Sequence, residues 1–190
     1  CHTVEKHANA IIHSIKDLLH QAELRLQDIA IIAVNHGPGS FTGLRVGLAT
    51  AQALAQANQQ AMLTMSNCAL YAFACIRRNT NLKIGDFIGV MLDAKLAQVY
   101  FAMYKIDSNH LPLVIESEQV INPEAITYEH TDGHCMRIGP GWEVANNKLN
   151  TDWSRYPYDA LCMAGPTGIQ QIAYSEIQDV REKLSMSSIM

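Results

Sequence analysis

One stretch, NHGPGSFTGLRVGLATAQALAQ at residues 35–56, limits the possible folds of this chain more than any other. A glycine-proline-glycine turn leads directly into a helix made almost entirely of glycine, alanine and aliphatic residues. A glycine turn before a helix can bring backbone N–H groups close to a phosphate. A helix that is apolar on all sides needs protein cover on all sides. The function of the chain depends on whether this stretch binds a phosphate or contacts another protein surface.

The segments around this stretch predict a layered α/β domain. Apolar residues recur every three or four positions over about residues 4–23, which is typical of an amphipathic helix. The β-branched run at 28–34 indicates a buried strand that pairs in parallel with a neighbour. A second short strand is expected at 61–65, and together these segments alternate as helices and strands do in α/β proteins.

Polar residues at helix starts predict where the next two helices begin. Ser40 or Thr42 can cap the glycine-rich helix, which is expected to end near residue 56. Ser66 or Asn67 can cap a third helix that continues to about residue 77.

The second half of the chain is richer in strands. Three successive strands predict an antiparallel meander, and they are expected at 87–92, 98–106 and 113–121. The remaining elements are a helix from 123 to 128, a strand and turn at 137–141 and a final helix at 166–177. We therefore expect an N-terminal α/β lobe at 1–84 and a strand-rich C-terminal lobe at 85–190, whose final helix can return to the first lobe.

Composition disfavours several classes of function. The net charge is −4 and no block of basic residues occurs, which disfavours a protein that binds nucleic acid alone. The longest apolar stretch is interrupted by Arg45, Gln52 and Gln56, so no membrane span is expected. The five cysteines form no CxxC pair, which favours reduced thiols in a cytosolic protein.

Motifs for catalysis are weak. The glycine turn lacks the lysine of a phosphate-binding P-loop, and no GxSxG sequence occurs. Asp93 follows a strand and could orient a magnesium-bound phosphate, although such an aspartate more often closes a turn. The histidines of the first helix are not spaced three or four apart, so no zinc pair is expected. For the apolar helix, burial inside the domain and contact with another protein both stay open.

Four segments resemble the TsaB (YeaZ) family. One of them, IKDLLHQAELRLQDIAIIAVNHGPGSFTG, has the family's order of helix, strand and loop. HGPGSFTGLRVGLATAQALA resembles the hallmark of that family, and RIGPGW resembles its later glycine turn. MLDAKLAQVYFAMY resembles its DAR-x-x-E-V-Y strand pair, with Lys95 in place of the arginine and Gln98 in place of the acid. The similarity covers most of residues 4–145.

The resemblance implies an actin/sugar-kinase/Hsp70-like ATPase fold, which is ribonuclease H-like, with two lobes that each carry a mixed sheet. It also implies that the family's opening strand hairpin, with its phosphate loop, is missing from this chain. The family is a noncatalytic paralogue of TsaD, which carries a metal-binding His-x-x-x-His motif. Those two positions fall on Asn67 and Tyr71 here, so the resemblance implies no metal site and no intrinsic activity.

The resemblance further implies a cytoplasmic subunit of the complex that makes threonylcarbamoyladenosine in tRNA. It would bind TsaD, join the TsaE ATPase, dimerise when alone and contact tRNA only through the complex. The implied partner surface contains Ile12, Ile15, Leu19, Leu44, Val46, Gly47, Leu48 and Ala51. A vestigial phosphate site, with weak ATP or ADP binding and no required cofactor, would contain Gly37, Gly39, Ser40, Thr42 and Asp93. The alternative is an ATPase or a peptidase of the wider glycoprotease family.

Overall fold

The computed structural model describes residues 2–127, 134–145, 148–150 and 152–159, with side chains from residue 10 onward. The chain divides into two compact units, Cys1–Asn67 and Cys68–Met190. The domain limits expected from the sequence, 1–84 and 85–190, stay a prediction. The helix expected at 166–177 lies outside the described residues.

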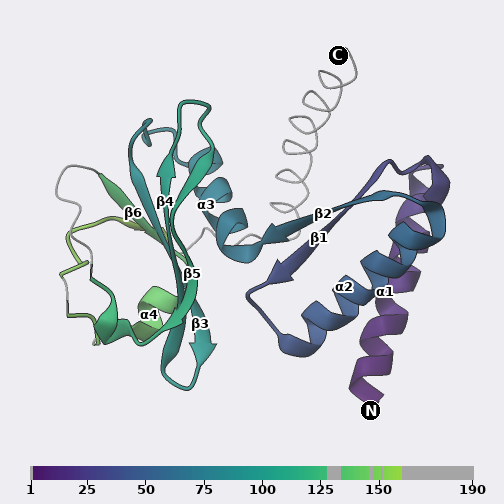
Figure 1. The fold of residues 1–190 in the computed structure, drawn as a ribbon, viewed down its shortest axis with the longest axis horizontal. Coiled ribbons are helices and arrows are strands. Elements are labelled where there is room, and N and C mark those ends of the chain that lie inside the picture. Colours follow the sequence, from purple (N-terminus) through teal and green to yellow (C-terminus); the bar gives the residue numbers. More distant parts are fainter. Residues whose placement is uncertain (1, 128–133, 146–147, 151, 160–190) are drawn as a thin grey trace. The chain divides into compact units, whose positions relative to one another are not determined.

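The first unit is a small α/β layer. Its elements are α1 (His2–Gln21), the 3-10 helix η1 (Leu26–Asp28), β1 (Ile31–Gly37), α2 (Phe41–Asn58) and β2 (Ala61–Ser66). The two strands pair in parallel, from Ile31 opposite Ala61 to Asn35 opposite Met65. Helix α2 joins them, as a parallel pair requires. It packs against both strands, and α1 packs against α2 (Figure 1).

The first strand differs from the expectation in its start and in its burial. It begins at Ile31 because the three residues after Arg25 form η1, where the Asp28 carboxylate accepts a hydrogen bond from the Arg25 backbone N–H at 2.9 Å. Only Gly37 of β1 and Met65 of β2 are buried. The expectation of a buried strand was therefore wrong, since most described residues of β1 and β2 are partly or fully exposed.

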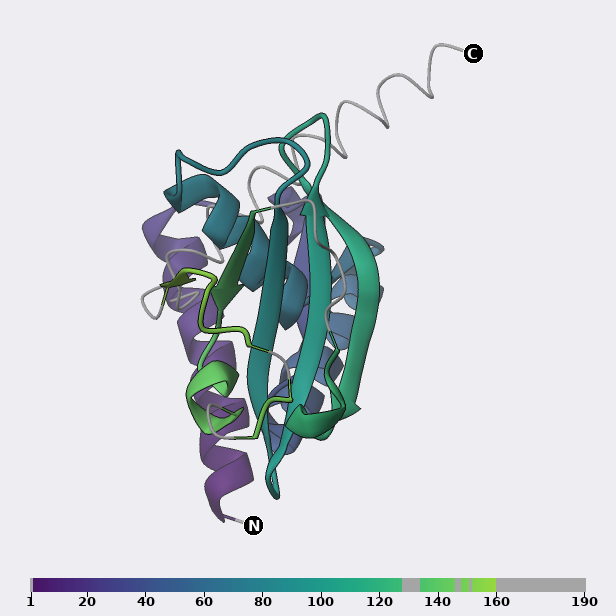
Figure 2. The same cartoon turned by 90° about the vertical axis from the view of Figure 1, so that its left-hand side faces the viewer.

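The second unit is built on a five-stranded mixed sheet. Its elements are α3 (Asn67–Arg78), β3 (Phe87–Lys95), β4 (Gln98–Ile106), β5 (Pro112–Ile121), η2 (Pro123–Ala125), β6 (Cys135–Ile138), α4 (Gly141–Ala145) and β7 (Tyr158–Asp159). The strand order is β5-β4-β3-β6-β7. Strands β3, β4 and β5 are antiparallel neighbours, so the predicted meander is confirmed. Figure 2 shows the long strands side by side, and α4 packs mainly on β3 and β4.

The helix expected at 123–128 is instead the short 3-10 helix η2. Pro123 stands at its start, and Ile126 ends it in an extended conformation. The Ile126 side chain is buried in the core of the unit. Tertiary burial of this apolar residue therefore takes precedence over a longer helix.

An aromatic core holds the second unit together. The ring centroids of Trp142 and Trp153 lie 4.8 Å apart, and Phe101 meets Trp142 edge-on at 6.3 Å. The indole N–H of Trp142 donates to the Gly89 carbonyl at 3.1 Å. A Cβ on Gly141 would lie 2.6 Å from the Met91 carbonyl carbon. Gly141, the second glycine in RIGPGW, is therefore required for close packing on β3.

Candidate functional site

The glycine turn of the first unit folds back onto the start of α2. Strand β1 ends at the buried Gly37, whose φ of +114° favours glycine. A Cβ at this position would lie 3.0 Å from a methyl carbon of Leu44 in the first turn of α2. The Gly37–Pro38 peptide is cis. The turn is therefore shaped by close packing between the end of the strand and the helix.

Two asparagine side chains of the first unit form hydrogen bonds with this turn. The Gly37 N–H donates to Asn35 Oδ1 at 2.6 Å, and Asn35 Nδ2 donates to Asn67 Oδ1. Asn67 Nδ2 then donates to the Pro38 carbonyl at 2.6 Å. A chain of three hydrogen bonds thus joins the end of β1, the turn and the residue that follows β2.

The residues proposed for phosphate binding in this unit are close together at the start of α2. The N–H of Gly37 does not point toward a ligand, because Asn35 already accepts it. Ser40 takes the N-cap position, but its hydroxyl makes no capping hydrogen bond, and Thr42 lies inside the helix. The expected side-chain cap is therefore absent, and the first turn is closed by the backbone N–H of Leu44 donating to the Ser40 carbonyl at 2.9 Å.

Asp93, the remaining residue of that set, belongs to the second unit. Its carboxylate accepts hydrogen bonds from the Lys95 backbone N–H at 2.8 Å and from Lys95 Nζ at 2.6 Å. These bonds lower the pKa of Asp93. They close a turn in which Lys95, Leu96 and Ala97 all have left-handed φ angles.

Asn67, one of the two positions where TsaD carries a metal-binding histidine, makes hydrogen bonds within this chain. The amide of Asn67 is bonded on both sides, to Asn35 and to Pro38. Among the described residues, no group of three or more His, Cys, Asp or Glu side chains could hold a metal ion.

The thiol beside Asn67 is not an activated nucleophile. Cys68 is fully buried, and burial, followed by the nearby Glu118 carboxylate, raises its pKa well above the ordinary value. It therefore stays protonated near neutral pH, and a thiol in that state attacks poorly.

The predicted partner residues gather on two packed helices. We call them the α1–α2 surface, which consists of the partly exposed residues Ile12, Ile15 and Leu19 of α1 and Leu44, Val46, Gly47 and Leu48 of α2. Ala51 is only 6% exposed, so it lies beneath this surface. Of the described side chains of α2, only Ala51 and Ala55 are buried.

Two further apolar side chains on these helices were not predicted as partner residues. Leu18 is 56% exposed and Phe41 is 67% exposed. Leu18 shares the three-to-four periodicity of α1, which could have identified it. The Arg45 guanidinium, the sole charged group of α2, lies 3.8 Å from the centre of the Phe41 ring.

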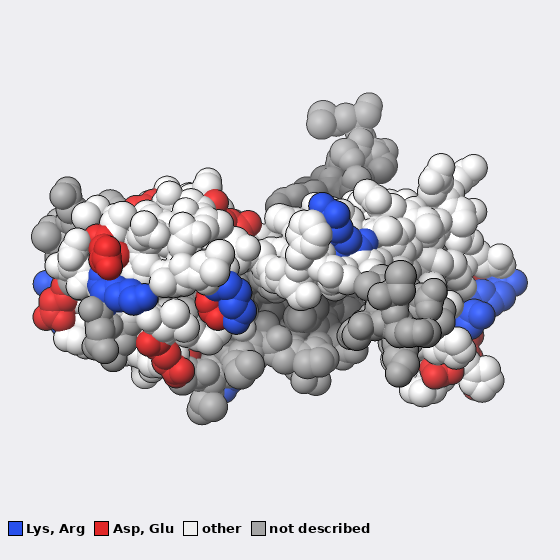
Figure 3. Space-filling model, turned by 90° about the horizontal axis from the view of Figure 1, so that it is seen from below, with Lys and Arg blue, Asp and Glu red and all other residues white. Residues whose placement is uncertain are grey.

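Charged side chains are sparse on the face of the chain seen in Figure 3, where Lys and Arg form only small separate groups. No helix within the described part of the chain is long and apolar enough to cross a membrane.

Comparison with known proteins identifies relatives over most of the chain. Residues 2–183 match the family model described as TsaD, tRNA N6-adenosine threonylcarbamoyltransferase. The tRNA threonylcarbamoyladenosine biosynthesis protein TsaB of Escherichia coli K12 is 31% identical over 73% of this chain. TsaB of Haemophilus influenzae is 31% identical over 72% of this chain. The chain spans 59% of the length of each of these two curated relatives.

A solved structure has the same fold. It is the crystal structure of an uncharacterized Pseudomonas aeruginosa protein with similarity to peptidase YEAZ. It superposes with a TM-score of 0.70 at 27% identity, over 81% of this chain and 68% of its own. The α/β fold class expected from the sequence is thereby confirmed.

Proposed function

The chain belongs to the TsaD family, described as tRNA N6-adenosine threonylcarbamoyltransferase, and on this premise we propose that it is a noncatalytic subunit that binds a TsaD-like paralogue. Its role is then to stabilise or activate that catalytic subunit in making threonylcarbamoyladenosine in cytoplasmic tRNA. A TsaE-like ATPase joins the assembly, and tRNA is contacted through the complex. The names of the two TsaB relatives support this role.

The observation that carries the proposal is the α1–α2 surface. Exposed apolar patches on a protein surface mark sites of interaction. On the same two helices, Leu18 and Phe41 are also exposed. We propose that the same surface binds either a second copy of the chain or the catalytic paralogue, so that the two contacts exclude each other.

The test places a charge on this surface. In the Val46→Glu variant an unpaired carboxylate would enter a dry contact, which costs several kcal/mol. We expect the variant to lose both the homodimer, measured by analytical ultracentrifugation, and the catalytic complex, measured by calorimetry and by tRNA modification in a reconstituted assay. Ile12→Lys should behave in the same way.

Thermal unfolding is the control for both variants. Since Val46 and Ile12 are partly exposed, their substitution should leave the unfolding midpoint near that of the wild type. Retention of both complexes by a folded Val46→Glu variant would place the interface elsewhere.

The competing proposal is an enzyme, an ATPase or a peptidase. It is supported by the similarity of the Pseudomonas structure to peptidase YEAZ. The buried Cys68 and the bonded Asn67 argue against catalysis at the start of α3. ATP turnover and peptide hydrolysis, each measured with and without the paralogue, discriminate the two proposals, and we expect neither from the chain alone.

A further inference from the structure

Two side-chain amides stand at the two ends of β2. Gln60 precedes the strand and Asn67 follows it. Each amide reaches across to one end of the neighbouring strand β1, where the chain enters from α1 or leaves toward α2. Both contacts lie within the first unit.

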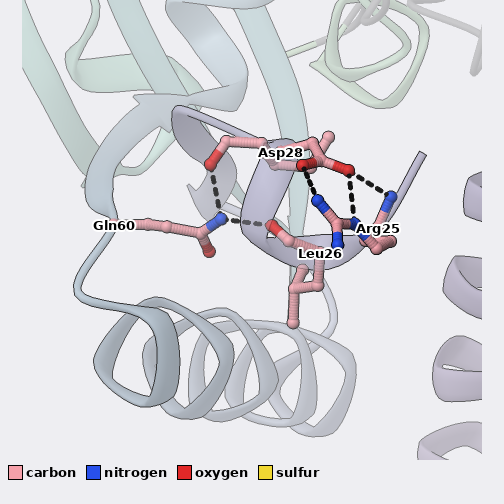
Figure 4. A network of polar contacts seen from close by, with 5 residues as sticks. Arg25, Leu26, Asp28 and Gln60 are labelled. Carbon is pink, nitrogen blue, oxygen red and sulfur yellow. Dashed lines mark hydrogen bonds and ion pairs between the residues drawn. The ribbon is translucent and has the colours of Figure 1, made fainter.

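Gln60 forms hydrogen bonds with the connection that follows α1. Its Nε2 donates to the carbonyls of Leu26 and Ile29, which begin and follow η1. Figure 4 shows this amide beside Leu26 and next to the Arg25–Asp28 ion pair. The Gln60 backbone N–H also donates to the Ala55 carbonyl at 2.9 Å, in the last turns of α2. One residue thus ties the connection after α1 to the end of α2.

Asn67 forms hydrogen bonds with the connection between β1 and α2. Its Nδ2 donates to the Pro38 carbonyl and its Oδ1 accepts from Asn35. A Cβ on Gly39 would lie 3.5 Å from Asn67 Nδ2, so the amide also packs against the turn. The start of α2, three residues after Pro38, is held through this contact.

These bonds matter because apolar packing inside the unit is thin. The buried apolar side chains among its described residues are Ala51, Ala55 and Met65. A unit with so small a core relies more on directional polar contacts to fix its helices.

We propose that Gln60 and Asn67 are positioning residues that hold α1 and α2 in the arrangement that a partner recognises. The inference rests on the proposed function, since it assigns the α1–α2 surface to partner binding. Neither side chain belongs to that surface. Their loss should therefore weaken binding through the shape of the surface, without removing any contact to the partner.

The experiment uses Gln60→Ala, Asn67→Ala and the double variant, in the full chain. Asn58→Ala is the matched control, because the Asn58 amide donates at 3.1 Å to the Leu54 carbonyl inside α2 alone. Affinity for the catalytic paralogue is measured by calorimetry at a temperature where circular dichroism shows every variant folded. We expect about tenfold weaker binding for Gln60→Ala and for Asn67→Ala, or about 1.4 kcal/mol, and wild-type binding for Asn58→Ala.

Amide chemical shifts of the isolated chain give a second measurement that does not need a partner. Gln60→Ala should move shifts along α1, and Asn67→Ala should move shifts along the first turns of α2 and at Gly37. Wild-type affinity in a folded Gln60→Ala or Asn67→Ala variant would overturn the inference. So would shift changes confined to the immediate neighbours of the substituted residue.

The two proposals fail in different ways. If the wild-type chain binds neither the paralogue nor itself, the proposed function is overturned, and the shifts still decide whether the amides position the helices. If the wild type binds and the Gln60→Ala and Asn67→Ala variants bind equally well, only the positioning role is overturned.

Discussion

The two units use apolar residues differently. In the second unit six successive residues of β3, from Phe87 to Leu92, are buried, and large side chains such as Trp142 and Trp153 fill the core. In the first unit the strands and α2 are just as apolar in sequence, yet few of their described side chains are buried. Apolar content therefore does not reveal whether a segment packs inside its own unit or awaits another surface.

The largest expected effect removes the centre of the second core. Trp142→Ala should lower the free energy of unfolding by about 4 kcal/mol, because it leaves a cavity beside Trp153 and Phe101. Leu48→Ala in the first unit should cost about 1 kcal/mol, since Leu48 is partly exposed. Urea denaturation measures both. Equal losses would contradict the contrast between the units.

A matched pair of glycines sharpens the contrast. Gly141→Ala should destabilise by about 2 kcal/mol, because the new methyl group meets the backbone of Met91. Gly47→Ala has open space around it and should stabilise α2 by up to about 1 kcal/mol. The same Gly47→Ala change should weaken partner binding if a helix approaches closely there. Thermal unfolding and calorimetry on both variants test the pair.

The pH dependence of stability tests whether the Cys68 thiol in the second unit is shielded from water. The pKa of Cys68 is raised in the folded state, so the thiol stays neutral there after it would ionise in the unfolded chain. The contribution of Cys68 to the free energy of unfolding is fully present below the unfolded pKa of about 9 and is lost as the pH rises above that value. The free energy of unfolding then falls by at most about 1.4 kcal/mol per pH unit.

Cys68→Ala should show a shallower decline between pH 8 and about pH 10 in urea titrations. An unchanged slope would mean that water reaches the Cys68 thiol in the folded state.

The smallest expected effect is at the exposed ion pair of η1 in the first unit. Arg25 and Asp28 form a two-point ion pair, and Arg25 is largely exposed. Because solvent screens such pairs, Arg25→Ala should leave the thermal unfolding midpoint almost unchanged. A large drop would show that η1 is a weak point of the first unit.

Local patterns predicted most elements, and long-range contacts account for the errors. The limits of β4, Gln98–Ile106, agree with the prediction because strand propensity and burial coincide there. The start of β1 was misplaced because the bonds between Arg25 and Asp28 form a 3-10 turn that apolar patterning does not reveal. Residues 123–128 were misassigned because burial of Ile126 overrides local helix signals.

The candidate site was predictable to the same extent. Periodicity and resemblance named the residues on α1 and α2, whose role in binding stays a prediction. The bonds of Asn67 to Asn35 and of Gln60 to Leu26 span 32 and 34 residues. No local pattern carries such information, so these amides became visible only in the folded chain.

The order of strands also bears on how the chain is made. Strands β3, β4 and β5 pair with their neighbours in sequence, and such local topologies fold fast. Strands β1 and β2 pair only after the 18 residues of α2 have crossed between them. The first unit leaves the ribosome first, and its apolar helices stay uncovered at least until β2 has paired with β1. Chaperones and proteases act on such surfaces, so under the proposed function the lifetime of this protein in the cell should depend on how soon the proposed partner binds.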